Sequence, residues 1–338
     1  MLSLIIPTRN RADFLEKAIR SLRSQTLSKN RFELIVVDNG STDHTSDLAQ
    51  TLAREWPNLR YFLEPEPGLH VGRHRGLAES TNELLVFADD DIQATPTWLE
   101  AIKEQFLDPD CAMVGGNNLP DFQGPVPDWL ESLWQRPMFG GQAITQLSVL
   151  SLPAGVREIN PYFVFGCNFS VRKSVVLEAG GFHPDGVPNE LIRFRGDGES
   201  HISKHVADSG MKCIFDSRAS VYHAVTEQRM SFEYFRRQAF NHGISDSFTA
   251  LRESPPHKSS LGPIKSMAQW FTTKKSDRRR WDMGREPRLK ELSRLVRDGY
   301  SEGFRFHQEQ YQADPEVRAW VHKPDYYPAV NLGPGRAG

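Results

Sequence analysis

The chain of 338 residues has few cysteines, no long apolar run and no excess of charge of either sign. Its three cysteines are odd in number and widely spaced, which excludes a disulfide framework and a CxxC metal site and favours a reducing compartment. The formal net charge of −2 provides no basic field that would attract nucleic acid, so we expect no nucleic-acid partner.

Targeting segments and common nucleotide-binding loops are also missing. The N-terminus lacks the features of a signal peptide, and no segment has the roughly 18 consecutive apolar residues of a membrane-spanning helix. We therefore expect a cytoplasmic protein. There is no GxxxxGKS/T pattern and no GxGxxG after the first apolar run, so a bound nucleotide would depend on side chains and a metal ion.

Short segments that are apolar along their whole length alternate with amphipathic helical patterns at the start of the chain. Strands are predicted at 2–7, 32–37, 59–63, 83–88 and 111–116. This alternation predicts an α/β fold with a mostly parallel central sheet and helices on both faces. Ligands of such sheets bind beyond the carboxyl ends of the strands. We therefore expect loops carrying TRNR, DNGSTD, EPEPGLHVGRHRG and DDD to meet at one edge.

The remaining chain divides into three parts. Residues 117–160 are rich in Pro and Gly and are predicted to be an irregular insertion that acts as a lid. We predict a domain over 1–225, which includes this insertion, and a mainly helical C-terminal extension over 226–338 that faces the acceptor or a membrane. Within the extension, 266–281 combines aromatic and basic residues. Peripheral contact with the inner membrane surface and a solvated helix face are both open interpretations of that segment.

Asp89, Asp90 and Asp91 follow directly after the predicted strand 83–88. Like charges at this spacing repel one another strongly unless a counter-charge is present, and helix capping by a single Asp explains a triplet poorly. Hard divalent cations such as Mg²⁺ and Mn²⁺ prefer carboxylate oxygens. Because side chains alternate along an extended segment, Asp89 and Asp91 would share one side and Asp90 would point to the other.

Six motifs in order resemble family-2 glycosyltransferases, and the resemblance covers residues 2 to about 245. They are SLIIPTRNR, IVVDNGSTD, GLHVGRHRG, FADDD, GCNFSVRKSVVLEAGGF and ASVYH. The resemblance implies a GT-A (Rossmann-like) fold and metal-dependent, inverting transfer of a sugar from a nucleotide-diphosphate sugar, with a UDP-sugar favoured. The acceptor would be a hydroxyl of a glycan or lipid-linked glycan, in surface polysaccharide or glycoconjugate biosynthesis.

The same resemblance implies roles for individual residues. The nucleotide sugar would contact Pro7, Thr8, Arg9, Asp38, Arg73, Asp89 and Asp90. An Asx-turn in DNGS is a further role for Asp38. Mn²⁺ or Mg²⁺ would be bound by Asp91, as the principal ligand, and by His223. The acceptor would contact Asn168, Arg236 and Arg237.

The catalytic base is expected in the segment RGDGESHISKHVADSGMK, where the family usually has a Glu-Asp pair. Counting back from Gly210 makes Glu199 the favoured base and Asp197 an orienting or acceptor-binding residue, although Asp197 could instead cap the helix. The altered pair, and His74 in place of the family's usual Asn, favour the alternative of a non-catalytic nucleotide-sugar-binding or scaffold protein with the same fold.

Overall fold

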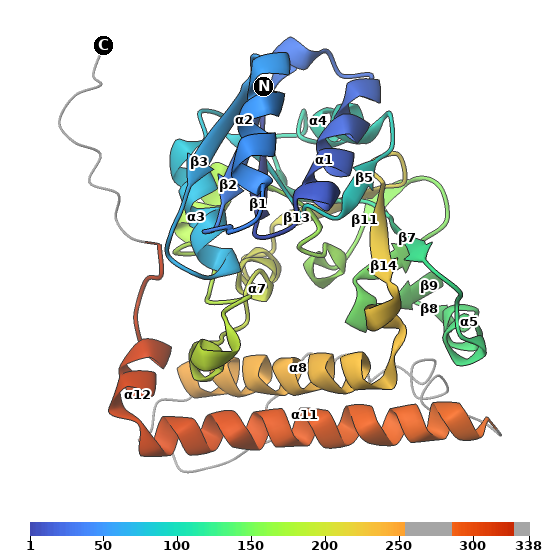
Figure 1. Cartoon of the computed structure of the whole chain (residues 1–338), viewed down its shortest axis with the longest axis vertical. Coiled ribbons are helices and arrows are strands. Elements are labelled where there is room, and N and C mark those ends of the chain that lie inside the picture. Colours follow the sequence, from blue (N-terminus) through green and yellow to red (C-terminus); the bar gives the residue numbers. More distant parts are fainter. Residues whose placement is uncertain (254–285, 328–338) are drawn as a thin grey trace.

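The computed structural model describes residues 1–253 and 286–327 of the chain. Within these residues an eight-stranded main sheet has the order β11-β13-β6-β12-β4-β1-β2-β3 (Figure 1). Its strands are β1 (Leu2–Thr8), β2 (Phe32–Asp38), β3 (Leu59–Leu63), β4 (Leu84–Ala88), β6 (Cys111–Gly115), β11 (Val156–Glu158), β12 (Asn168–Arg172) and β13 (Lys212–Asp216). The neighbours β3, β2, β1 and β4 are parallel, as are β13 and β6, whereas β12 and β11 are antiparallel to their neighbours. The prediction of a mostly parallel central sheet is confirmed.

Helices cover both faces of the main sheet, which explains why its strands are apolar along their whole length. In β1, Leu4 and Ile6 belong to a core shared with α1 (Ala12–Ser21), α2 (Thr45–Glu55) and α4 (Trp98–Gln105). Ile5, between them, belongs to the opposite core, which includes residues of α3 (Leu69–Glu79), α6 (Lys173–Glu178) and α7 (Ser200–Asp208). Successive side chains of the strand therefore enter different cores.

A second sheet corrects the prediction of an irregular insertion. Its order is β5-β14-β7-β10-β9-β8, and four of these strands and helix α5 (Asp128–Trp134) lie within 117–160. The strands are β5 (Ile92–Ala94), β7 (Asn118–Gln123), β8 (Pro137–Met138), β9 (Gly141–Ile144), β10 (Val149–Ser151) and β14 (Val221–Thr226). Strands this short carry too little alternation to be recognised between prolines and glycines. A lid function for this segment stays a prediction.

The segment after β3 is a helix rather than the expected loop. Helix α3 contains Gly72 and Gly76, which weaken a helical pattern in the sequence. A Cβ atom at Gly76 would lie 2.2 Å from Cγ2 of Ile5, and one at Gly72 would lie 3.1 Å from Cβ of Pro7. The two glycines therefore allow α3 to pack closely on β1, which brings the side chain of Arg73 to the carboxyl edge of the sheet.

The described C-terminal residues are helical, as predicted. Helix α8 (Phe232–Glu253) and helix α11 (Pro287–Ala313) lie side by side, and α12 (Pro315–Val321) follows them (Figure 1). A Cβ atom at Gly303 would lie 1.9 Å from the carbonyl oxygen of Phe240, and one at Gly243 would lie 2.1 Å from that of Tyr300. Close approach of the two helices thus depends on glycine. A boundary at residue 225 stays a prediction.

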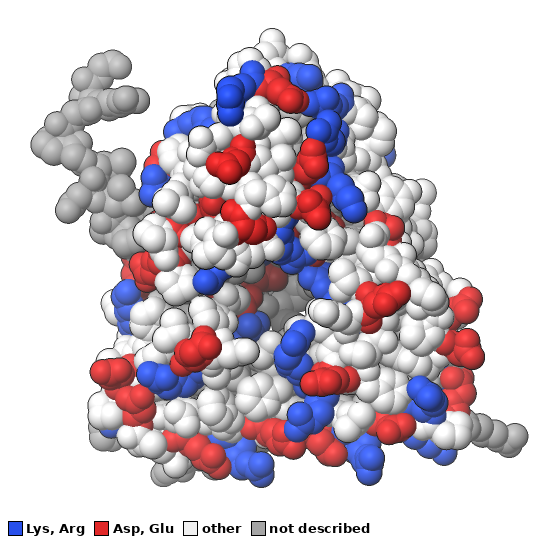
Figure 2. Space-filling view, viewed as in Figure 1, with Lys and Arg blue, Asp and Glu red and all other residues white. Residues whose placement is uncertain are grey.

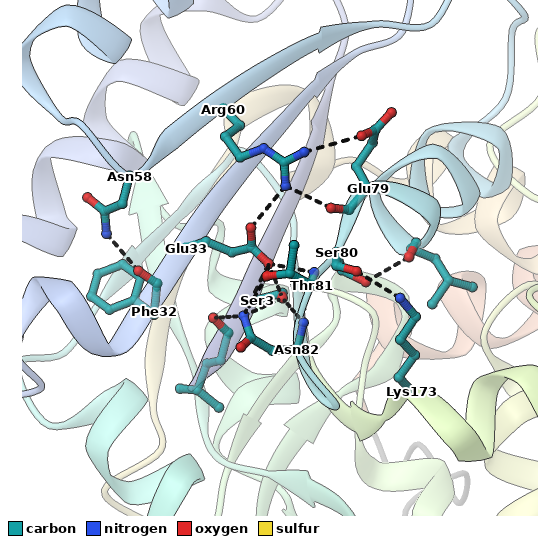
Figure 3. Close-up of polar contacts among 12 residues, drawn as sticks. Ser3, Phe32, Glu33, Asn58, Arg60, Glu79, Ser80, Thr81, Asn82 and Lys173 are labelled. Atoms are coloured by element: carbon teal, nitrogen blue, oxygen red, sulfur yellow. Dashed lines mark hydrogen bonds and ion pairs between the residues drawn. The ribbon is translucent and has the colours of Figure 1, made fainter. Parts of the chain in front are cut away.

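A buried glutamate ties the strands together at the edge opposite their carboxyl ends (Figure 3). Oε1 of Glu33, in β2, accepts hydrogen bonds from Ser3 Oγ at 2.6 Å, from Thr81 N at 2.8 Å and from Asn82 Nδ2 at 3.1 Å. Oε2 accepts one from Arg60 Nη1 at 3.0 Å. This network links β1, β2, β3 and the segment before β4, so it stabilises the fold away from the polar edge.

Candidate active site

The carboxyl ends of the central parallel strands meet at one edge of the main sheet. Thr8 and Asp38 are paired in register at the ends of β1 and β2. Asp89 follows β4, and the chain then passes through Asp91 into β5 of the second sheet. Figure 2 shows Asp and Glu side chains together with Lys and Arg around a hollow above α8.

Strand pairing in the second sheet brings His223 to the acidic triplet. β5 and β14 are antiparallel, and Ile92 stands opposite His223. As a result, one ligand atom from each of Asp89, Asp91 and His223 can be chosen so that all lie within 4.8 Å of one another. The structure thus brings together Asp91 and His223, the two predicted metal ligands, with Asp89.

Asp91 is buried and surrounded by positive charge. Its Oδ2 accepts hydrogen bonds from Arg11 Nη2 at 2.7 Å and from Arg229 Nη2 at 3.0 Å. Burial alone would raise the pKa of Asp91, but His223 and the two arginines outweigh it and hold that pKa well below its usual range. Neither arginine is among the residues predicted from the sequence. Three adjacent carboxylates need positive charge nearby, and this need is the sequence signal that could have indicated these arginines.

Asp89 is half-buried and lies between the other acids and Arg73. The Arg73 Nη2 atom is 3.6 Å from Asp89 Oδ1. Burial raises the pKa of Asp89, an effect that Arg73 opposes and the neighbouring Asp91 reinforces. Bringing a cation to Asp89 and Asp91 would favour the ionised form of both carboxylates.

Asp90 points away from this group, as the alternation of side chains predicts. It accepts a hydrogen bond from Thr8 Oγ1 at 2.7 Å, and its Oδ1 lies 3.0 Å from Arg11 Nε. Burial raises the pKa of Asp90 to about 7, even though Arg11 opposes this shift. The side chain is therefore engaged inside the protein, and contact of Asp90 with the nucleotide sugar stays a prediction.

Glu199 immediately precedes α7 and faces the same edge. Its Oε2 lies 3.1 Å from Arg73 Nη1, and its Oε1 accepts a hydrogen bond from Gly166 N at 3.2 Å. A Cβ atom at Gly166 would lie 2.5 Å from Arg73 Nη2 and 2.7 Å from Glu199 Oε1, so a larger residue there would displace the ends of both paired side chains. Gly198, with φ of 58°, turns the chain into the helix.

Asp197, the second predicted catalytic residue, lies deeper than Glu199. Its Oδ1 is 2.5 Å from His183 Nδ1, and its Oδ2 accepts a hydrogen bond from Thr249 Oγ1 at 2.6 Å. Burial would raise the pKa of Asp197, but His183 and Thr249 outweigh it and lower that pKa. The side chain does not cap α7, so the capping alternative is wrong. Its contacts suit a residue that holds the loop carrying Glu199.

The residues predicted to surround the base and ribose are partly buried. Pro7 and Thr8 are buried in β1, and Arg9 is exposed. Asp38 Oδ1 accepts a hydrogen bond from Ser41 N at 2.8 Å, three residues on rather than the two of an Asx-turn, so the side chain holds the DNGS turn in a different way from the one expected. Asp38 Oδ2 accepts another from Tyr61 OH at 2.9 Å. Contact of these residues with a nucleotide stays a prediction.

Two of the three predicted acceptor residues have partners inside the protein. Asn168 is buried, where its Oδ1 accepts from Trp98 Nε1 at 2.8 Å and its Nδ2 donates to Ala219 O at 3.0 Å. Contact of Asn168 with the acceptor stays a prediction. Arg236 forms an ion pair with Glu302 of α11, whereas the exposed Arg237 lies over the ring of Tyr234 at 5.3 Å.

His74, which replaces the family's usual Asn, has a structural role. Its Nε2 accepts a hydrogen bond from Phe182 N at 2.8 Å. Burial lowers the pKa of His74 to about 3, so the ring is neutral at ordinary pH and suited to accept that bond. His74 therefore links α3 to the backbone at Phe182.

The donor set fits a hard or borderline divalent cation. The two carboxylates provide the oxygen ligands that Mn²⁺ and Mg²⁺ sites use, whereas the imidazole nitrogen suits transition-metal ions better than Mg²⁺. The Asp91 Oδ1 atom and the His223 Nδ1 atom are buried, and neither has a hydrogen-bond partner within the described residues. A buried carboxylate oxygen without a hydrogen-bond partner is a position that a cation would stabilise, even though His223 Nε2 lies 3.4 Å away.

Comparisons with known proteins identify the family. A family model described as "Glycosyl transferase family 2" matches residues 3–178. This chain belongs to glycosyltransferase family 2. It is 28% identical over 214 residues to "Glycosyltransferase AglE" of Haloferax volcanii, with 63% of each chain covered. It is 33% identical over 191 residues to "GalNAc(5)-diNAcBac-PP-undecaprenol beta-1,3-glucosyltransferase" of Campylobacter jejuni, covering 56% of this chain and 57% of that one. The chain thus spans less than two thirds of the length of either relative.

A solved structure shares the fold of this family-2 chain. It is "Mannosyltransferase PcManGT from Pyrobaculum calidifontis in complex with GDP-Man and Mn2+", with a TM-score of 0.54 and 17% identity, covering 95% of this chain and 82% of that one. The predicted GT-A-type α/β fold is confirmed. Among the helices of residues 1–253 and 286–327, none combines the length and apolarity needed to cross a bilayer. Residues 266–281, with their two interpretations, lie outside the described residues.

Proposed function

We propose that this protein is an inverting glycosyltransferase that moves a sugar from a nucleotide-diphosphate sugar to a hydroxyl group of a glycan or lipid-linked glycan. The observation that carries the proposal is the position of Arg73, which contacts both Glu199 at 3.1 Å and Asp89 at 3.6 Å. A candidate base and a candidate cation-binding group thus stand on either side of one buried guanidinium. A single displacement uses both groups. A base takes the proton of the attacking hydroxyl while a stabilised leaving group departs from the carbon under attack.

Glu199 is the proposed general base. It is the less buried of the two predicted catalytic carboxylates, with 26% of its side chain exposed against 9% for Asp197. Its carboxylate can therefore reach an acceptor hydroxyl, while Arg73 and Gly166 N orient it. Removing the proton as the hydroxyl attacks would give inversion without a nucleophilic side chain.

Asp89, Asp91 and His223 would hold the cation, for which Mn²⁺ and Mg²⁺ are both candidates. When bound, such an ion acts as a Lewis acid that neutralises the negative charge of a departing nucleoside diphosphate. Arg73 adds a fixed positive charge beside the same position. The relative from Campylobacter jejuni supports a lipid-linked acceptor, because its name specifies an undecaprenol-linked substrate. A UDP-sugar as donor stays part of the proposal.

Binding and hydrolysis of donors test the proposal. A panel of UDP-, GDP- and dTDP-sugars is screened by thermal shift with and without Mn²⁺, and release of nucleoside diphosphate is then followed without acceptor. We expect one nucleotide class to stabilise the protein only with the cation and to be hydrolysed slowly. A donor that binds tightly with Mn²⁺ but is neither hydrolysed nor transferred would favour the non-catalytic alternative. Absence of any cation-dependent binding would overturn both.

A further inference from the structure

Arg229 has no role in the function proposed above, yet it contacts two of the three candidate cation ligands. It lies in a 3-10 turn, Glu227–Met230, that joins β14 to α8. Its Nη2 donates to Asp91 Oδ2 at 3.0 Å, and its Nη1 lies 3.2 Å from His223 Nε2 and 3.2 Å from Ala224 O. The guanidinium therefore bridges a carboxylate and an imidazole that are both buried.

The contact with His223 is incompatible with cation binding by the same nitrogen. His223 Nε2 lies 3.2 Å from Arg229 Nη1 and 3.4 Å from Asp91 Oδ1, so it accepts from the guanidinium in one tautomer and donates to the carboxylate in the other. An imidazole nitrogen has one lone pair, and a metal ion would need that same pair. In either tautomer the guanidinium lies 3.2 Å from this nitrogen and 3.0 Å from Asp91 Oδ2, so Arg229 must move before the two ligands can share a cation.

Arg11 is a contrasting neighbour within the same group. It also donates to Asp91 Oδ2, at 2.7 Å, but its other ion pair is with Asp90 at 3.0 Å rather than with His223. It can therefore keep both contacts while Asp91 Oδ1, which has no hydrogen-bond partner among the described residues, binds an ion. Arg229 thus competes with a cation for the imidazole of His223, whereas Arg11 pairs with Asp90 instead.

We propose that Arg229 occupies the ligands Asp91 and His223 in the absence of donor and transfers its guanidinium to the diphosphate when donor and cation bind together. This inference rests on the proposed function for the identity of the ligand as a nucleoside diphosphate. Guanidinium groups bind phosphate oxygens in the same paired geometry that they use for carboxylates, so Arg229 can exchange one anion for the other. Its side chain is 21% exposed and therefore accessible from the site.

Such an exchange makes cation and nucleotide binding mutually favourable. A cation alone must displace Arg229 without providing it with a new partner, whereas a diphosphate provides one. The binding of Mn²⁺ should then be weak alone and strengthened by nucleotide, and Arg229→Ala should remove part of this coupling. Coupling free energies of this kind typically correspond to changes in affinity of about 5- to 150-fold.

The test measures binding by the full chain without any turnover. Affinity for Mn²⁺ alone is measured by electron paramagnetic resonance, and affinity for UDP and for GDP in saturating Mn²⁺ is measured by calorimetry. The proteins are wild type, Arg229→Ala, Arg229→Lys and the matched control Arg11→Ala, each checked for folding by circular dichroism. In Arg229→Ala we expect Mn²⁺ to bind about tenfold more tightly and the nucleoside diphosphate about tenfold more weakly. Arg229→Lys, which keeps the charge but cannot bridge both ligands, should also bind Mn²⁺ more tightly.

Three results would overturn the inference. These are equal affinities in wild type and Arg229→Ala, weakening of both ligands in Arg229→Ala, and tightening of Mn²⁺ binding in Arg11→Ala as large as in Arg229→Ala. The last result would mean that removing any nearby positive charge is enough to tighten the binding of Mn²⁺. Failure of the proposed function looks different, because a wild type that binds Mn²⁺ and nucleotide cooperatively but transfers no sugar leaves the exchange by Arg229 intact.

Discussion

Arg73 and Glu199 form an ion pair in which Nη1 of the arginine lies 3.1 Å from Oε2 of the glutamate. The arginine side chain is only 3% exposed, so the pair is held within the protein and aims the carboxylate toward the site. The same guanidinium lies 3.6 Å from Asp89. Charges at the base and at the cation-binding group are thus coupled through one residue, which makes substitutions at either end informative.

Replacing Glu199 with Gln should abolish transfer and leave binding intact. The amide keeps an oxygen that can accept from Arg73 or Gly166, but it cannot take a proton from the acceptor. We expect kcat to fall by about 100- to 10,000-fold, the usual contribution of a general base. The affinity for nucleoside diphosphate with Mn²⁺, measured by calorimetry, should change less than about threefold, well under the effect on kcat. Unchanged turnover would remove Glu199 from the mechanism.

Asp91→Ala should eliminate the dependence of donor binding on metal. The substitution removes a candidate ligand and leaves Arg11 and Arg229 without their shared carboxylate. Asp90→Asn is the matched control, because this side chain contacts Thr8 and Arg11 instead of the cation-binding group. Calorimetry with and without Mn²⁺ should show a metal effect in Asp90→Asn and none in Asp91→Ala. An equal loss in both variants would contradict the assignment of Asp91.

Glu33 should make the stability of the fold depend on pH. Burial raises the pKa of this carboxyl, but hydrogen bonds from Ser3, Thr81 and Arg60 outweigh burial and lower that pKa below the value in the unfolded chain. The unfolded state therefore binds the proton more readily, so the contribution of Glu33 is present above about pH 4.3 and is lost as pH falls through the lower folded pKa.

Urea denaturation of Glu33→Gln measures this contribution. We expect its free energy of unfolding to be about 1–3 kcal/mol lower than that of wild type at pH 7, with a smaller difference at pH 4. The exposed Glu16, which pairs with Arg20 on the surface of α1, provides the control Glu16→Gln, which should change stability little. If the difference in free energy of unfolding between Glu33→Gln and wild type grew toward low pH, the predicted lowering of the pKa of Glu33 would be contradicted.

Gly303→Ala should destabilise the packing of α8 against α11. The added methyl group would lie 1.9 Å from the carbonyl oxygen of Phe240, so the helices would have to separate. We expect a loss of about 1–3 kcal/mol in the free energy of unfolding, as for other overpacked interfaces. Ser301→Ala, at an exposed position of the same helix, should be nearly neutral. Thermal unfolding of the two variants compares them directly, and equal midpoints would refute the close contact.

The strands of the main sheet could be predicted because burial on both faces leaves an uninterrupted apolar run. Helix α3 could not be predicted. Gly72 and Gly76 allow this helix to pack closely on β1, but glycines within a segment also obscure the helical pattern in its sequence. The second sheet was equally hidden, since its strands are short and β5 and β14 pair although they are far apart along the chain. β5 at Ile92 pairs with β14 at His223, and nothing local to either strand specifies the other.

The predicted site residues that lie together after folding include those for which chemistry limits the choice, the two carboxylates Asp89 and Asp91. Adjacent carboxylates at Asp89 and Asp91 need a counter-charge wherever the chain places them. Sequence spacing could not show that Asn168 accepts a hydrogen bond from Trp98. It also could not show that Arg229 supplies part of the positive charge beside Asp91. These roles depend on which neighbours a side chain meets after folding.

The sequence by itself determined an alternating α/β chain, a family and a cluster of acids at the end of a strand, because burial and charge act over a few neighbouring residues. Only the tertiary structure decided which cations surround those acids and which carboxylate stays accessible. Electrostatic energy and solvent access depend on distance in space. That distance, between Arg229 and His223 or between Arg73 and Glu199, is set by packing and by strand register.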